Sequence, residues 1–154
     1  MPRWRRWATA LAADDGSASL EFVSAGVLLL VPLVYLVLAM ASVQGGSLSV
    51  EGAARQAARV YVQASSEAEA RARAESAVRF ALADYGLDAA DATVRIRCAP
   101  DPARCLTRRG IVTVRVGVRV PLPLVPSGLS VATGASVPLE ADSAQQVSRF
   151  WSGG

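Results

Sequence analysis

The chain has 154 residues, which allows at most one domain beside a membrane helix. All 16 basic residues are arginine and there are 13 acidic residues, so the net charge of +3 is too small, taken alone, to indicate a polyanionic partner. The absence of histidine and lysine removes the commonest general base, the commonest metal ligand and any SxxK nucleophile. No glycine-rich phosphate loop is present. We therefore expect no enzyme activity, no cofactor and no metal.

The N-terminal part has the features of a membrane anchor. Residues 1–16 contain three arginines, and the later run Phe22 to Val43 contains no charged residue. As a helix, this run spans about 33 Å, enough to cross a hydrocarbon core of about 30 Å. The positive-inside rule keeps the arginines cytoplasmic and sends the C-terminal part outward. We expect a cytoplasmic leader over residues 1–16 and a transmembrane helix over residues 17–46.

A secretory signal peptide is an alternative interpretation of the same segment. Ala39-Met40-Ala41 before Ser42 fits the A-x-A cleavage pattern. However, its apolar region would extend over about 20 residues instead of the usual 7–15, and its charged region would end in Glu21. This alternative predicts a secreted, soluble protein that begins at Ser42.

Residues 47–86 have the pattern of one long amphipathic helix. Apolar residues recur at spacings of three and four, with one change of register. Gly45 and Gly46 precede this helix as an expected flexible point, and Gly86 supplies a C-terminal cap. Alanine dominates the apolar face, which either allows close packing against a copy or partner helix or reflects composition alone. Four Glu–Arg pairs have the favoured spacing and orientation: Glu51–Arg55, Glu67–Arg71, Glu69–Arg73 and Glu75–Arg79.

Residues 87–154 change to a period of two. The segments 93–98 and 111–120 alternate polar and apolar residues, with valines on one face of the second segment, which predicts half-buried antiparallel strands. A third extended segment, near residues 135–145, contains Pro138 and is expected to be an edge strand. The predicted fold is α+β. It has one N-terminal transmembrane helix that continues into the amphipathic helix, then a small exported antiparallel sheet of about three strands.

Two cysteines lie between the first two predicted strands. Cys98 and Cys105 enclose six residues that include two prolines. In an exported domain a disulfide is the default interpretation, with a stabilisation of roughly 2–2.5 kcal/mol in the loop-entropy model. A redox-active pair lacks the C-x-x-C spacing, and two reduced buried cysteines are the remaining alternative.

The same region is rich in arginine. By strand alternation, the solvent face of the hairpin carries Arg95, Arg97, Arg115 and Arg119. A face of one sign can attract polyanions, but no aromatic residue is interleaved for stacking on single strands. We favour a solvated face that blocks edge-to-edge association of sheets, and we expect no nucleic-acid partner.

The start of the apolar segment carries a specific pattern. It reads Gly16-Ser17-Ala18-Ser19-Leu20-Glu21-Phe22, with Val31-Pro32-Leu33 inside the run and AARQAAR at residues 53–59. Over about residues 12–60, the chain resembles the TadE-like minor pilins of tight-adherence (Tad) secretion systems, which build Flp-type IV pili. The sheet region matches that family only in general layout, and the extra domain of the longer TadG-like relatives is lacking.

This resemblance implies a processing and assembly role for four residues. A membrane prepilin peptidase would cleave between Gly16 and Ser17. Glu21, followed by Phe22, would then stand at position five and pair with the terminal amine of a neighbouring subunit, a pairing that favours both ionised forms. Asp14 and Asp15 depart from the family pattern, in which a basic residue precedes the cleaved glycine.

The function implied is that of a minor pilin-like structural component, anchored once in the cytoplasmic membrane with its N-terminus inside and its C-terminus exported. Its expected partners are the membrane, the prepilin peptidase, other pilins or pseudopilins and the Tad assembly-platform proteins. The alternative is a signal-anchored envelope protein whose small basic domain binds a polyanion or a protein. Assembly requires the carboxylate of Glu21, whereas a plain anchor does not.

Overall fold

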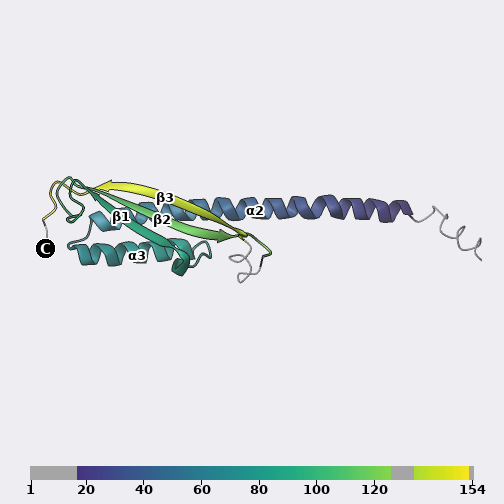
Figure 1. The fold of residues 1–154 in the computed structure, drawn as a ribbon, viewed down its shortest axis with the longest axis horizontal. Helices are drawn as coiled ribbons and strands as arrows, with labels where there is room; N and C mark the ends of the chain where they lie inside the picture. Colours follow the sequence, from purple (N-terminus) through teal and green to yellow (C-terminus); the bar gives the residue numbers. More distant parts are fainter. Residues whose placement is uncertain (1–16, 126–133, 153–154) are drawn as a thin grey trace, which may run out of the picture. The chain divides into compact units, whose positions relative to one another are not determined.

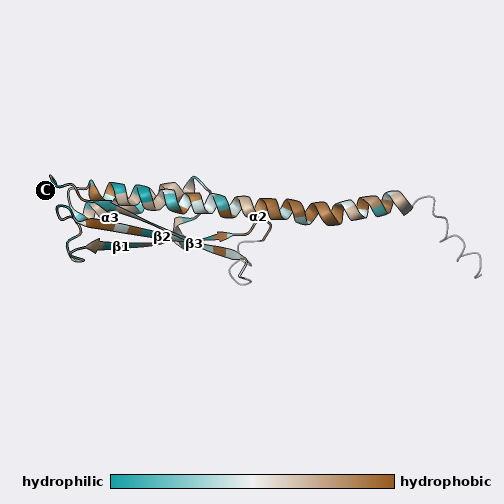
Figure 2. Ribbon diagram, turned by 90° about the horizontal axis from the view of Figure 1, so that it is seen from above, coloured by the Kyte–Doolittle hydropathy of each residue, from teal (hydrophilic) through white to brown (hydrophobic). Residues whose placement is uncertain are grey.

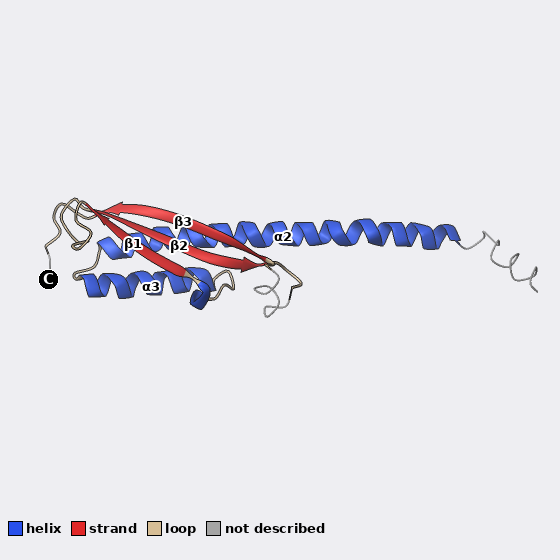
Figure 3. Ribbon diagram, viewed as in Figure 1, coloured by secondary structure: helices blue, strands red, loops and turns tan. Residues whose placement is uncertain are grey.

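The computed structural model describes residues 17–125 and 134–152 and has an α+β fold. In chain order its elements are α2 (Ser17–Val62), α3 (Glu67–Ala83), the short 3-10 helix η2 (Ala89–Asp91), β1 (Thr93–Ala99), β2 (Ile111–Pro121) and β3 (Ser136–Gln146) (Figure 3). The chain divides into two units, residues 1–38 and residues 39–154, and each is described by itself below. The predicted leader, Gly16 included, lies outside the described residues.

The described part of the first unit is the beginning of α2. Its large apolar side chains are exposed. Figure 2 colours much of this part of the helix brown, the colour of hydrophobic residues. Pro32 lies inside α2 without ending it, and the Ser24 hydroxyl donates a hydrogen bond to the carbonyl of Leu20. By length and composition α2 is able to cross a membrane, which is compatible with a single-pass anchor.

The second unit, which we call the head, has two layers. The end of α2 and the whole of α3 lie side by side and cover one face of the sheet (Figures 1 and 2). The Ser49 hydroxyl of α2 donates to the carbonyl of Ala81 in α3 over 3.4 Å. The strand order is β1-β2-β3, and both strand pairs are antiparallel. The predicted three-stranded antiparallel sheet is therefore confirmed, with β3 at an edge.

The central strand β2 supplies much of the core. Its alternating valines, predicted to share one face, are all buried: Val112, Val114, Val116, Val118 and Val120. The opposite face of β2 carries Thr113 and Arg115, which are only partly buried. Because β-branched residues fit a half-buried pleated surface, the period of two correctly predicted which side chains enter the core.

The alanine-rich face of α2 packs within the head. Ala53, Ala54, Ala57 and Ala58 have no exposed surface, and neither has Tyr61, the largest of the fully buried side chains. The facing residues of α3 are Ala70, Ala74, Val78 and Leu82, all buried in the same core. The alanines thus let helices of one chain approach closely, and their burial leaves them no surface for a partner helix.

The prediction of one continuous helix over residues 47–86 is wrong. The helical region is interrupted between Val62 and Glu67. Ser66 caps α3 by accepting a hydrogen bond from the Glu69 amide (3.3 Å), while the Glu69 carboxylate accepts one from the Ser65 amide (2.9 Å). This resembles a capping box, in which two amides at a helix start are satisfied by side chains. Because the chain turns back between the two helices, the apolar faces of α2 and α3 are buried together.

The end of α3 agrees with the sequence prediction. Gly86 has a positive φ of 68°, a conformation that costs other residues more than glycine. The Leu87 amide donates to the Leu82 carbonyl (3.0 Å) and the Gly86 amide to the Ala83 carbonyl (2.9 Å). These two hydrogen bonds form a Schellman motif, so Gly86 ends the helix as expected.

Gly46 has a packing role that the sequence did not indicate. It was expected to be a flexible point, but α2 continues through it without interruption. A Cβ atom at this position would stand 2.4 Å from Cγ2 of Val120 and 3.0 Å from Cδ1 of Leu139. The missing side chain therefore allows the sheet to approach the backbone of α2.

We expect Gly46→Ala to be less stable than Gly52→Ala by about 1–3 kcal/mol, the usual effect of overpacking. Both changes gain the same helix propensity, about 1 kcal/mol, but a Cβ at Gly52 would meet no atom within 4 Å. Denaturant unfolding of the full-length protein in detergent measures the difference. Equal stability of the two variants would show that the close approach at Gly46 is not a constraint.

Candidate functional site

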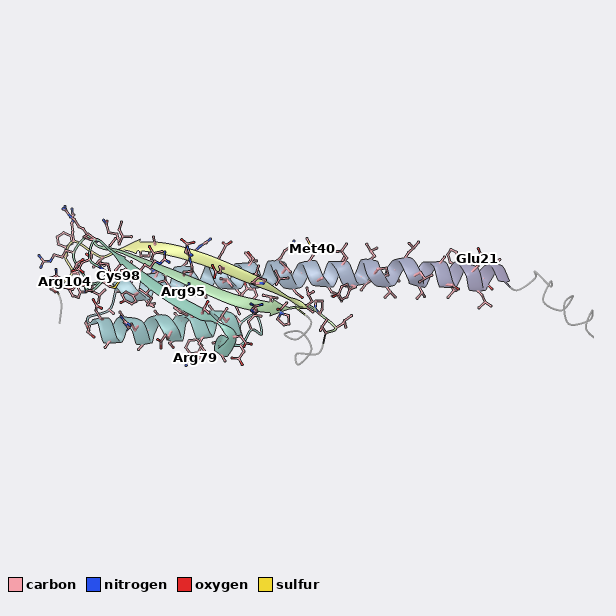
Figure 4. The ribbon with its side chains drawn as sticks, in the orientation of Figure 1. Glu21, Met40, Arg79, Arg95, Cys98 and Arg104 are labelled. Carbon is pink, nitrogen blue, oxygen red and sulfur yellow. A yellow bond between two sulfur atoms is a disulfide. The ribbon has the colours of Figure 1, made fainter. Side chains whose placement is uncertain are left out.

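The predicted assembly segment lies at the beginning of α2. The helix begins at Ser17, and Glu21 lies on its first turns (Figure 4). The flanking apolar side chains are strongly exposed, with 71% of Leu20 and 80% of Phe22 accessible. Because α2 begins at Ser17, a cut after Gly16 would leave the whole helix in the mature chain.

Glu21 has no cationic partner among the described residues. The first cation that follows it along the sequence of α2 is Arg55, 34 residues later. Arg55 is already engaged by Glu51 at 2.8 Å. A carboxylate next to an apolar, membrane-length surface is unfavourable unless it reaches water or a positive charge. The geometry therefore leaves Glu21 available to a cation from outside the described residues.

The cysteines form the predicted disulfide. Cys98 is bonded to Cys105, with their Cα atoms 5.0 Å apart, and the bond closes the loop between β1 and β2. Within this loop Asp101 accepts hydrogen bonds from Nε of Arg104 (2.8 Å) and from the Ala103 amide (2.9 Å). The Arg104 guanidinium, followed by the Ala103 amide, lowers the pKa of the Asp101 carboxyl. The disulfide thus closes the loop covalently, and the hydrogen bonds that Asp101 accepts fix its conformation.

Glu67 connects this loop to α3. Its Oε1 accepts hydrogen bonds from the amides of Cys105 (2.7 Å) and Leu106 (3.4 Å). The expected Glu51–Arg55 and Glu69–Arg73 pairs are present, at 2.8 Å and 2.6 Å. The sequence predicted that Glu67 pairs with Arg71 as well, but its carboxylate holds the disulfide loop. No local pattern could show this, because the partners lie 38 and 39 residues apart.

The C-terminal tail is attached to the same end of the head. Nε1 of Trp151 donates to the Ala64 carbonyl over 3.0 Å, and the Trp151 carbonyl accepts from Nε of Arg108 over 2.9 Å. Figures 1 and 4 show the loop with Cys98 and Arg104 at this end, near the C-terminus. We call it the tip: the α2–α3 turn (residues 63–66), the β1–β2 loop (residues 100–110) and residues 147–152. The sequence predicted the disulfide beside this loop, but not that the three segments meet at one end of the head.

Burial of Tyr61 has an electrostatic consequence. Burial, followed by the negative charge of Glu67, raises the pKa of the Tyr61 hydroxyl, and Arg71 opposes this effect. The hydroxyl makes no hydrogen bond of good geometry with any described residue. Tyr61 therefore stays neutral at physiological pH and acts as a packing residue.

The four arginines of the predicted hairpin face are placed as expected. Arg95 and Arg97 are exposed on β1, and they alternate with residues that face the core. Arg95 is opposite Arg115, and Arg119, which is opposite Pro138, follows the same alternation along β2. Their shared solvent face follows from this register.

The expectation that this face has one sign is wrong. In the pairing register of β3, Asp142 is opposite Arg115 and Glu140 is opposite Gly117. Oδ1 of Asp142 lies 3.9 Å from a terminal nitrogen of Arg115. The third strand therefore brings two acids to the arginine face, which weakens its attraction for a polyanion.

Among residues 17–125 and 134–152, no group of three or more potential metal ligands occurs. Comparison of the whole chain with protein-family models, curated proteins and solved structures gives no match. Proposals about function therefore rest on the residues and geometry of this chain.

We expect Glu67→Ala to destabilise the head by about 1–3 kcal/mol, because two loop amides lose their acceptor. Glu75, an exposed acid on the same helix, supplies the control, and Glu75→Ala is expected to change stability by no more than about 0.5 kcal/mol. Denaturant unfolding of the oxidised full-length protein measures both. A loss of the same size in the two variants would contradict a specific role for Glu67.

Proposed function

We propose that this protein is a minor pilin-like structural component in the assembly of a Tad/Flp type IV pilus or a related secretion apparatus. The observation that carries the proposal is the organisation of α2. One uninterrupted helix of 46 residues begins with a carboxylate in an exposed apolar surface and ends inside the core of a folded head. This organisation suits a subunit that is stored in a membrane and assembled through its N-terminal helix.

Helix α2 contributes residues to both units of the chain. Gly46, Val50 and Ala53 of α2 are buried in the head, whereas residues earlier in the helix expose their apolar side chains. The backbone between the two parts stays helical, so no glycine-rich or proline-rich linker joins them. The helix therefore serves both as the proposed anchor and as a core element of the exported domain.

The location proposed is the cytoplasmic membrane, with a single span, a cytoplasmic N-terminus and an exported head. The disulfide supports the exported location, because such bonds persist mainly in oxidising compartments. The proposal includes no catalytic role, and the absence of histidine and lysine from the sequence supports that part.

The alternative function, an anchored protein that binds a polyanion through its hairpin face, has weaker support. Glu140 and Asp142 share that face with the arginines. A one-signed surface is the feature that would favour a polyanion, and it is lacking here. We therefore retain assembly as the proposed function, and a plain membrane anchor is one outcome of the tests below.

The first test concerns processing. When a prepilin peptidase is co-expressed, we expect intact mass to show loss of the first 16 residues and a new N-terminus at Ser17. Gly16→Leu should block this cleavage, since a large side chain replaces the small residue before the cut. A mature chain that begins at Met1 under these conditions would contradict prepilin-type processing. A chain that begins at Ser42 would instead support the secretory alternative.

The second test concerns Glu21. We expect Glu21→Gln to preserve expression, orientation and cleavage but to reduce co-assembly with partner pilins by about tenfold, the loss of one charge-assisted contact. Glu51→Gln is a matched control, because Glu51 is the other acid of α2 and its pair with Arg55 is solvent-exposed. Crosslinking of processed subunits and pilus formation are the measurements. Assembly of Glu21→Gln at the parental level would favour a plain anchor.

A further inference from the structure

The tip contains an open cavity that neither the fold nor the proposed assembly requires. Its volume is about 590 Å³, and its lining residues are Glu67, Arg104, Leu106, Thr107, Arg108 and Trp151. They come from the start of α3, the β1–β2 loop and the C-terminal tail. Ligand sites commonly combine an apolar lining with a few convergent polar groups, and this cavity has both.

The apolar part of the lining is held in place. Leu106 is only 4% exposed and belongs to the core of the head. The Trp151 indole is oriented by the hydrogen bond from its Nε1 to the Ala64 carbonyl, 3.0 Å long. Its ring also packs against the core. The lining of the cavity therefore includes an aromatic side chain whose position is set before a ligand arrives.

The two arginines are oriented in a similar way. Nε of Arg104 donates to Asp101 at 2.8 Å, and Nε of Arg108 donates to the Trp151 carbonyl at 2.9 Å. Among the described residues, the terminal nitrogens of both guanidinium groups have no hydrogen-bond or ion-pair partner. Each arginine thus has its outer donors available, and such donors bind carboxylates strongly.

The charge of the cavity favours a ligand of modest negative charge. Glu67 is the single acid of the lining, and its Oε1 is occupied by the amides of Cys105 and Leu106. The lining thus has two arginines and one glutamate, and the glutamate already accepts two hydrogen bonds. This balance favours a ligand with one or two carboxylate groups over a dense polyanion. A single tryptophan offers no series of stacking platforms for successive bases, so nucleic acid is disfavoured.

We propose that the tip cavity binds an acidic oligosaccharide, with a uronic acid unit whose ring lies on Trp151 and whose carboxylate is bound by Arg104 and Arg108. The Thr107 hydroxyl supplies a neutral polar group for a sugar hydroxyl. An open cavity of about 590 Å³ leaves room for neighbouring sugar units of a chain. This inference goes beyond assembly, and its test depends neither on cleavage nor on filament formation.

The probe is a trimer of galacturonic acid, titrated against the full-length protein in detergent at constant ionic strength. The chain has three tryptophans, so Trp4→Phe/Trp7→Phe leaves Trp151 as the only one and makes its fluorescence a reporter of the cavity. We expect a saturable change with the acidic trimer. The neutral galactose trimer should bind at least about tenfold more weakly, because it lacks the carboxylates.

Two charge-removing variants, made in this tryptophan background, locate the site. Arg104→Gln/Arg108→Gln should weaken binding by about tenfold or more, whereas Arg95→Gln/Arg97→Gln should change it less than about twofold. The second pair removes the same charge from exposed positions on β1. Arg104→Gln alone is a further measure with little risk to folding, because that side chain is 78% exposed.

The proposal would be overturned by a lack of saturable change with the acidic trimer, by equal binding of the neutral trimer, or by an equal loss in both double variants. Inorganic phosphate is also tested, at the same ionic strength, as a competitor of the acidic trimer. Displacement of the trimer by phosphate at equal concentration would indicate a simple anion site without recognition of the sugar ring, and would also refute the inference. Failure of cleavage or assembly would leave these measurements unaffected.

Discussion

The head depends on close contact between the backbone of α2 and the layers around it. Alanine side chains at four fully buried positions and the missing side chain of Gly46 bring α3 and the sheet near the helix axis. Small residues bury little apolar area, so the valines of β2 and the residues Tyr61 and Leu82 have to supply most of the hydrophobic stabilisation. A larger residue on the small face would separate the layers, and these larger side chains would lose their contacts.

Three nonlocal connections hold the other end of the head. The disulfide closes the loop between β1 and β2, Glu67 binds that loop to the start of α3, and Trp151 binds the tail to the α2–α3 turn. A domain of this size, with an alanine-rich core, gains from such cross-links because its core alone contributes modestly. The same connections orient the groups that line the tip cavity. The stability of this end of the head and the proposed binding surface thus depend on one set of contacts.

Local patterns in the sequence predicted the elements but not the contacts between them. The alternation of β2, the proline in β3 and the cap at Gly86 each depend on a few neighbouring residues, and all three predictions hold. The break between α2 and α3 was missed even though Ser66 and Glu69 have the spacing of a capping box, because the strong helical period on both sides outweighed it. The acids on the arginine face, the role of Glu67 and the packing at Gly46 depend on register and topology, which one sequence does not reveal.

The charges of the head and the charge of Glu21 have different explanations. The head's ion pairs at Glu51, Glu69 and Asp101 are local and solvent-exposed, so each contributes little to stability and none requires a partner molecule. Glu21 differs because its surroundings on α2 are apolar and no described residue neutralises it. Leucine at that position would suit a simple anchor better, since an acid at the edge of an apolar segment is unfavourable. The carboxylate is therefore left to a cation from outside the described residues. Under the proposed function, that cation is the terminal amine of a neighbouring subunit, which has the required charge.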